Sequence, residues 1–74
     1  MSNVPPTSYA ELANLLEQLP LLVHERRRAQ RLSLRAAAKE AGVSFSTMTR
    51  FEKGQDAVLS NTLLMLRWLD GGAS

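Results

Sequence analysis

Five side chains between positions 45 and 53 are spaced to form one stripe along an α-helix, and their types suit contact with a nucleic acid. They are Phe45, Ser46, Thr49, Arg50 and Lys53, at relative positions i, i+1, i+4, i+5 and i+8. Arginine can bond a guanine edge through two N–H groups, serine and threonine can bond several base edges, and a phenyl ring or a threonine methyl can contact a thymine methyl. The stripe predicts a helix that reads bases in the major groove, although Phe45 could equally fold back onto the core.

The residues around this stripe suit the DNA backbone. Ser44 is first a helix cap, but with the free N–H groups at the helix N-terminus it could also hold a phosphate. Arg35 and Lys39 precede it and are expected to be phosphate contacts or solvated charges. Residues 23–54 contain eight Lys or Arg and three Glu, a net charge of +5, whereas the whole chain carries +2. Such a basic patch attracts polyanions, and a solvated helix face would show the same charges.

Two short helices joined by a tight turn are predicted to position the stripe. Ser33 suits the N-cap of a helix at 34–41, and Gly42 suits the left-handed position that ends it. Ser44 then caps a helix at 45–52. On that second helix Met48 and Phe51 lie three positions apart on another face, so they are predicted to pack into the core.

Three further helices are predicted around this pair. Ser8 and Glu11 form a capping box for a helix at 9–19, with one apolar face made of Leu12, Leu15, Leu16 and Leu19. Pro20 is expected to end or kink that helix and to begin another at 21–30. Ser60 suits the cap of a last helix at 61–69, whose expected core residues are Leu63, Leu64, Leu66, Trp68 and Leu69.

The predicted fold is therefore all-α, a compact domain of five helices. The DNA-binding domain is expected at 9–69, with the helix-turn-helix at 33–52. Residues 1–8 are expected to form a flexible N-terminal arm, and residues 70–74 a flexible tail.

The composition argues against several other kinds of protein. The chain has no cysteine and a single histidine, His24, so we expect no disulfide, metal or other cofactor. No carboxylate pair lies in an apolar setting and no glycine loop could cradle a phosphate, which argues against an enzyme. The N-terminus lacks a secretory signal, and no apolar run approaches the ~18 residues that span a bilayer. The expectation is a cytoplasmic protein, associated with the nucleoid in a bacterial host.

The run SLRAAAKEAGVSFSTMTRFEKG, residues 33–54, resembles the helix-turn-helix of the phage repressor and Cro family, also called the XRE type. The likeness rests on Ser33, Ala38, the turn Gly42-Val43-Ser44 and the sequence Glu52-Lys53-Gly54. It continues into LSNTLLMLRWL, residues 59–69, which looks like the family's next core helix. In all, the resemblance covers roughly residues 21–69.

This resemblance implies sequence-specific binding of duplex DNA by the helix at 45–52. Position by position, it implies base contacts for Phe45, Ser46, Thr49 and Arg50, and phosphate contacts for Ser44, Thr47 and Lys53. It also implies a structural ion pair, because Arg27 stands where the family places an arginine that pairs with the glutamate matching Glu52. Leu34 departs from the pattern, since many members have a phosphate-contacting polar residue there.

The number of chains that bind together is left open by the sequence. A small regulator of this type often binds a palindromic site as a homodimer, with half-sites about 34 Å apart. Exposed parts of the helices at 9–19 or 61–69, around Trp68, could form the contact, and a monomer is equally compatible. A protein-interaction module on the same scaffold, such as an antirepressor or an antitoxin-like partner, is the alternative function. Its sign would be a stable protein complex with absent or salt-insensitive DNA binding.

Overall fold

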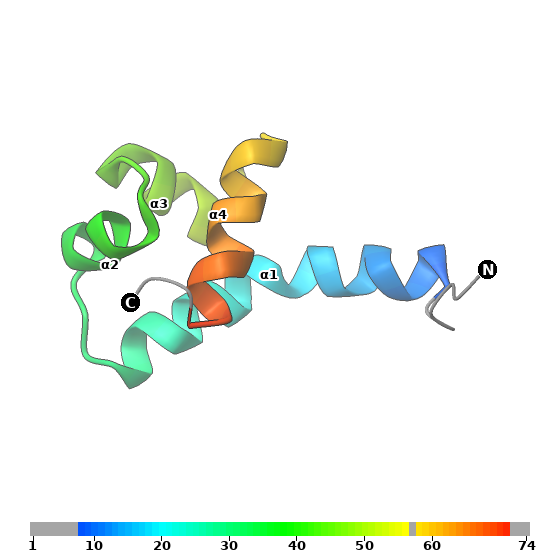
Figure 1. Ribbon diagram of the computed structural model, residues 1–74, viewed down its shortest axis with the longest axis horizontal. Helices are drawn as coiled ribbons and strands as arrows, with labels where there is room; N and C mark the ends of the chain where they lie inside the picture. Colours follow the sequence, from blue (N-terminus) through cyan, green and yellow to red (C-terminus); the bar gives the residue numbers. More distant parts are fainter. Residues whose placement is uncertain (1–7, 57, 72–74) are drawn as a thin grey trace.

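A computed structural model describes residues 8–56 and 58–71, and within these it contains four α-helices and no strand (Figure 1). The helices are α1 (Tyr9–Ala29), α2 (Leu34–Ala41), α3 (Phe45–Glu52) and α4 (Leu59–Leu69). The all-α class is confirmed, but the expected count of five helices is wrong, because the segments 9–19 and 21–30 form the single helix α1. The predicted arm and tail lie outside the described residues except for Ser8, Asp70 and Gly71.

Helix α1 runs through Pro20 because packing on both sides of the proline outweighs the lost hydrogen bond. Proline has no N–H to donate to the carbonyl of Leu16, one turn earlier. Leu16 lies on an exposed part of the helix, where water can reach that carbonyl. Leu19 and Val23 flank the proline and are both buried in the core, which fixes the helix there. The helix changes direction in this region rather than ending (Figure 1).

The helix-turn-helix forms as its capping residues predict. Ser33 Oγ accepts a hydrogen bond of 3.0 Å from the N–H of Ala36 at the start of α2. Gly42 ends that helix with φ at 84°, a left-handed conformation that favours glycine. Ser44 Oγ accepts 3.0 Å from the N–H of Thr47 and so caps α3. These local contacts set the angle at which α3 leaves the turn.

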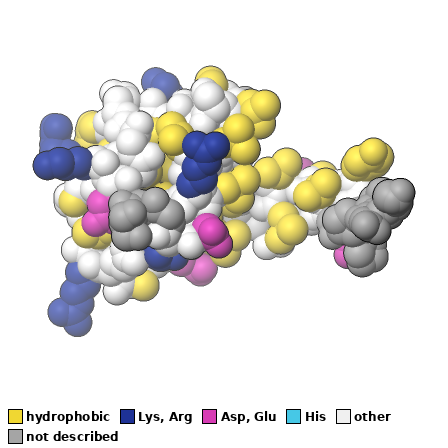
Figure 2. Space-filling model, in the orientation of Figure 1, with side chains coloured by type: hydrophobic (Ala, Val, Ile, Leu, Met, Phe, Trp, Pro, Cys, Tyr) yellow, Lys and Arg dark blue, Asp and Glu magenta, His cyan; other side chains and the backbone are white. Residues whose placement is uncertain are grey.

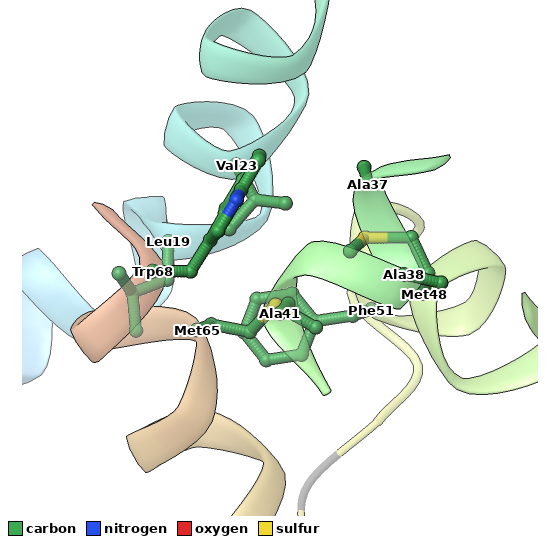
Figure 3. Packing of buried hydrophobic residues seen from close by; sticks show 9 residues of the cluster. All are labelled: Leu19, Val23, Ala37, Ala38, Ala41, Met48, Phe51, Met65 and Trp68. Atoms are coloured by element: carbon green, nitrogen blue, oxygen red, sulfur yellow. The ribbon is translucent and has the colours of Figure 1, made fainter. Parts of the chain in front are cut away.

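One hydrophobic core joins all four helices (Figure 3). Its buried members are Leu19, Val23, Ala37, Ala38, Ala41, Met48, Phe51, Met65 and Trp68. The predicted burial of Met48, Phe51 and Trp68 is confirmed. The three alanines of α2 have small side chains, which lets α3 approach closely. The inner face of α3 is thereby fixed, and its opposite side is left to solvent.

Two expectations about α4 are wrong. Leu63 and Leu66 are exposed, and Met65 is buried in their place. The sequence of α4 is apolar on nearly every side, so periodicity alone does not identify its inner face. The helix also begins at Leu59, before the predicted cap Ser60. Its N-cap is Val58, and among the described residues no side chain caps the helix. Asp56 Oδ1 accepts 3.0 Å from the N–H of Val58, which fixes the backbone just before α4 begins.

The apolar face expected for the first helix is also largely uncovered. Leu12, Leu15 and Leu16 are exposed, and Leu19 is the buried leucine of that set. The reason is geometric, since the first half of α1 extends past the body of the domain (Figure 1). No helix among the described residues is long and apolar enough to cross a membrane.

Candidate nucleic-acid interface

The outer side of α3 carries the four residues predicted to contact bases, here called the α3 stripe: Phe45, Ser46, Thr49 and Arg50. Phe45, Ser46 and Arg50 are exposed and Thr49 is half-buried. Because Met48 and Phe51 on the same helix are buried, the stripe cannot turn inward without breaking the core. The helix therefore presents a fixed set of side chains to solvent.

Phe45 lies outside the core, with 40% of its surface exposed. The guanidinium of Arg35 lies over its ring, 4.4 Å from the ring centre, which is a cation–π contact. Arg35 belongs to α2 and Phe45 to the first turn of α3, so the contact ties the two helices together at the surface. It also covers one face of the ring and leaves the rest of the ring available to a partner.

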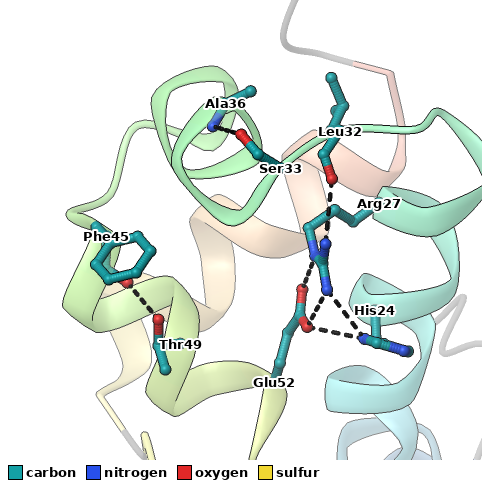
Figure 4. Close-up of polar contacts among 8 residues, drawn as sticks. All are labelled: His24, Arg27, Leu32, Ser33, Ala36, Phe45, Thr49 and Glu52. Carbon is teal, nitrogen blue, oxygen red and sulfur yellow. Dashed lines mark hydrogen bonds and ion pairs between the residues drawn. The ribbon is translucent and has the colours of Figure 1, made fainter.

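The hydroxyl groups of the segment differ in how free they are. Ser44 Oγ donates 2.9 Å to Thr47 Oγ1, so these two hydroxyls are already paired with each other. Thr49 Oγ1 donates 3.0 Å to the carbonyl of Phe45 (Figure 4). The methyl group of Thr49 and the lone pairs of its oxygen stay available to a base. Within the described residues Ser46 makes no side-chain hydrogen bond. Ser46 is thus the hydroxyl best able to donate to a base.

Arg50 is only loosely held. Its Nη2 lies 3.8 Å from Asp56 Oδ2, and its side chain is 55% exposed, whereas that of Asp56 is 1% exposed. An ion pair of this length with an exposed partner contributes little to stability. Asp56 is anchored by the N–H of Val58 and by Asn61 Nδ2, at 3.0 and 3.2 Å. Arg50 can therefore leave the carboxylate for a base or a phosphate at small cost.

The cations expected to contact phosphate are spread over both helices and the turn after α3. Lys39 on α2 and Lys53 after α3 are exposed, and in the described residues neither side chain makes a hydrogen bond or an ion pair. Leu34, the position that departs from the family pattern, packs against the core instead. The segment therefore has free positive charge on either side of the α3 stripe.

A partly buried ion pair holds the end of α3 against α1 (Figure 4). Arg27 Nε donates 2.7 Å to Glu52 Oε2, and its Nη2 donates 3.1 Å to Glu52 Oε1. Arg27 Nη1 also donates 3.1 Å to the carbonyl of Leu32, in the loop before α2. This two-point contact fixes direction as well as distance. One arginine thus links α1, the loop and α3.

His24 is a third member of this cluster. Its Nδ1 lies 2.8 Å from Glu52 Oε1, and because a carboxylate only accepts, the ring nitrogen donates. Burial alone would raise the pKa of Glu52. The hydrogen bonds from Arg27 and His24 outweigh it and hold the pKa of Glu52 below its usual range. The hydrogen bond to Glu52 raises the pKa of Arg27, so both partners stay charged.

Sequence reasoning missed three structural contacts of this kind. No contact was predicted for His24, although its place one turn before Arg27 on the same helix is a usable signal. Trp68 Nε1 donates 3.1 Å to Glu40 Oε1, and Arg26 Nη1 donates 2.7 Å to the carbonyl of Leu69. These two contacts join α4 to α2 and to α1 across long sequence separations, so no local sequence pattern predicts them.

The comparison with known protein families agrees with this geometry. The family described as the helix-turn-helix domain matches residues 18–65, which include α2, the turn and α3. The comparisons with curated proteins and with solved structures find no match. The matched segment covers well over half of the 74 residues. The chain therefore belongs to the helix-turn-helix domain family of DNA-binding proteins.

Proposed function

We propose that this protein is a sequence-specific transcription regulator that binds duplex DNA with α3 in the major groove. Phe45, Ser46, Thr49 and Arg50 contact base edges in this proposal. The phosphates of the DNA backbone are contacted by Lys39, Lys53 and the N-terminal end of α3 with Ser44 and Thr47. Arg35, whose guanidinium lies over Phe45, also contacts the DNA backbone in this proposal. The resemblance of residues 33–54 to phage repressors and Cro favours a regulator of phage or mobile-element type.

The observation that carries the proposal is the division of α3 into two sides. Met48 and Phe51 are buried on the inner side, and Ser46 and Arg50 are exposed on the outer side. A helix of this width fits the major groove. Glu52 is tied to α1 through Arg27, so the outer side keeps its direction when it meets DNA. A rigid helix with free donors is what direct base readout needs.

The test is selection of bound duplexes from a random pool, followed by titration of the best sequence at several salt concentrations. We expect one preferred sequence and a binding constant that falls steeply as salt rises, since phosphate contacts release counterions. Binding with equal affinity to scrambled duplexes would refute sequence-specific recognition. A homodimer would select a palindrome with half-sites about 34 Å apart.

A protein-interaction module on the same scaffold is the second candidate. The exposed leucines of α1 and α4 favour it, because apolar surface of this kind marks protein contacts. This alternative predicts a stable complex with another protein and no salt-dependent affinity for any duplex. The two candidates are therefore separated by the same titration.

A further inference from the structure

The first half of α1, residues 9–18, buries none of its side chains. It extends from the body as a helix (Figure 1), and its leucines are exposed to solvent. Leu12, Leu15 and Leu16 lie on one side of it, at the spacing of an amphipathic helix. Isolated helices of this length are marginal in water, so an uncovered apolar side is costly. This half of α1 needs a cover that the described residues do not supply.

A leucine groove lies beside it, between α1 and α4. Its volume is about 240 Å³, and its lining residues are all leucines: Leu12, Leu15, Leu16, Leu19, Leu22, Leu66 and Leu69. Figure 2 shows hydrophobic side chains continuing from the body along the projecting half of α1. No charged residue lines this groove, so its occupant must be apolar where it touches the leucines.

We propose that the leucine groove is a homodimer interface, in which the projecting half of α1 from each copy covers the groove of the other. The chain carries the required occupant, a short amphipathic helix with leucines on one side. That helix itself forms part of the α1 wall of its own groove, so it cannot also fill that groove. In a dimer with a two-fold axis, each copy covers the groove of the other, because the same apolar patch forms both sides of the interface.

The size of the patch sets the expected strength. Residues 9–22 rise about 20 Å, and α1 beside α4 makes a face roughly 20 Å wide. An apolar patch of roughly 400 Å² is large enough to mark an interaction site. Two such patches with their polar rims stay near or below about 1,200 Å² in total, the range of weak and transient interfaces. We therefore expect a weak dimer whose population depends on concentration.

The interface leaves the α3 stripe clear. Helices α2 and α3 lie at the far end of the molecule from the N-terminal half of α1 (Figure 1). Two copies joined through the leucine groove therefore still expose both α3 helices. That they would meet two half-sites of one palindrome rests on the proposed function, whereas the interface itself rests on burial alone.

The experiment is sedimentation equilibrium of the full chain between about 1 and 200 µM, a range that brackets weak association. We expect the mass to rise toward twice that of one chain. Leu15→Glu places a charge in the interface and should raise the dissociation constant at least about tenfold. Asn14→Glu adds the same charge on the polar side of the same helix, and should dimerise like the parent. Thermal melts at low concentration check that both variants fold.

The outcomes separate this inference from the proposed function. A parent chain that stays monomeric at the highest concentration overturns the dimer, and so does a Leu15→Glu variant that dimerises like the parent. Loss of dimerisation in both glutamate variants would also overturn the leucine groove as the interface. If the dimer forms but no duplex is selected, the proposed function fails and the interface stands. If a chain that stays monomeric binds a single half-site, the proposed function stands and the interface is refuted.

Discussion

The helix-turn-helix and the first half of α1 are both exposed at the surface, but for opposite reasons. Helix α3 buries Met48 and Phe51 and presents polar and cationic groups to solvent. Its outer side therefore needs no protein surface to cover it. Residues 9–18 show leucines outward and bury nothing. Polar groups exposed on a rigid helix suit a hydrated ligand such as DNA, whereas exposed leucines suit a protein surface. The two regions therefore offer different partners at different ends of one molecule.

The largest effect should come from comparing two leucines of α1. Leu19 is 4% exposed and Leu15 is 53% exposed. Leu19→Ala leaves a cavity in the core and should lower the free energy of unfolding by about 2–4 kcal/mol. Leu15→Ala should change it by less than about 0.5 kcal/mol in the monomer. Urea unfolding at low concentration measures both, and equal losses would mean that the two halves of α1 are packed alike.

The next effect concerns the ion pair that fixes α3. Glu52→Gln keeps the shape of the side chain but leaves the charge of Arg27 unpaired, and the Arg27 side chain is only 14% exposed. We expect a loss of about 2–3 kcal/mol in the free energy of unfolding. The matched control is Glu25→Gln, because Glu25 lies on α1 near Arg27 but is exposed. It should leave the free energy of unfolding unchanged. Equal stability of the two variants would show that the pair does not hold α3.

The same pair predicts a pH dependence. Because the folded-state pKa of Glu52 lies below its usual value, the pair stabilises the fold above the unfolded-state pKa of about 4.3. That stability is lost as the pH falls through the lower folded-state pKa. The difference in unfolding free energy between parent and Glu52→Gln should therefore shrink on acidification. A difference that stays constant from neutral pH to about pH 2 would assign the stability to packing instead.

The smallest effect should come from the surface contact between α2 and α3. A double-mutant cycle of Arg35→Ala and Phe45→Ala should give a coupling energy of about 0.5–1 kcal/mol, the usual range for an exposed cation–π pair. Chemical denaturation of the four proteins measures it. A coupling energy of zero would mean that Phe45 is held by α3 alone and is free to move when DNA binds.

The parts of the fold that sequence predicts well are those fixed by local contacts. Ser33, Gly42 and Ser44 act on residues within one turn, so α2 and α3 have the predicted bounds. Pro20 has a local preference to end a helix, and burial of Leu19 and Val23 by distant residues overrides it. The inner face of α4 is ambiguous because leucines surround it.

The candidate site divides in the same way. The α3 stripe follows from helical spacing, and the structure places its residues on one outer side. The contacts of Glu52 with His24 and of Arg50 with Asp56 join residues that a single sequence does not pair. The structure is therefore needed to tell which groups are free to bind. The hydroxyls of Ser44 and Thr47 are paired with each other, whereas that of Ser46 is free within the described residues.

The central claim is that α3 reads bases, and Arg50 tests it most directly. The measurement is the affinity of parent and Arg50→Ala for the selected duplex and for each of its single-base variants. We expect Arg50→Ala to bind roughly 1–3 kcal/mol more weakly and to lose preference at one base pair while keeping the others. Arg67→Ala removes the same charge from α4 and should keep every preference. An Arg50→Ala variant with the affinity and base preferences of the parent would contradict the account.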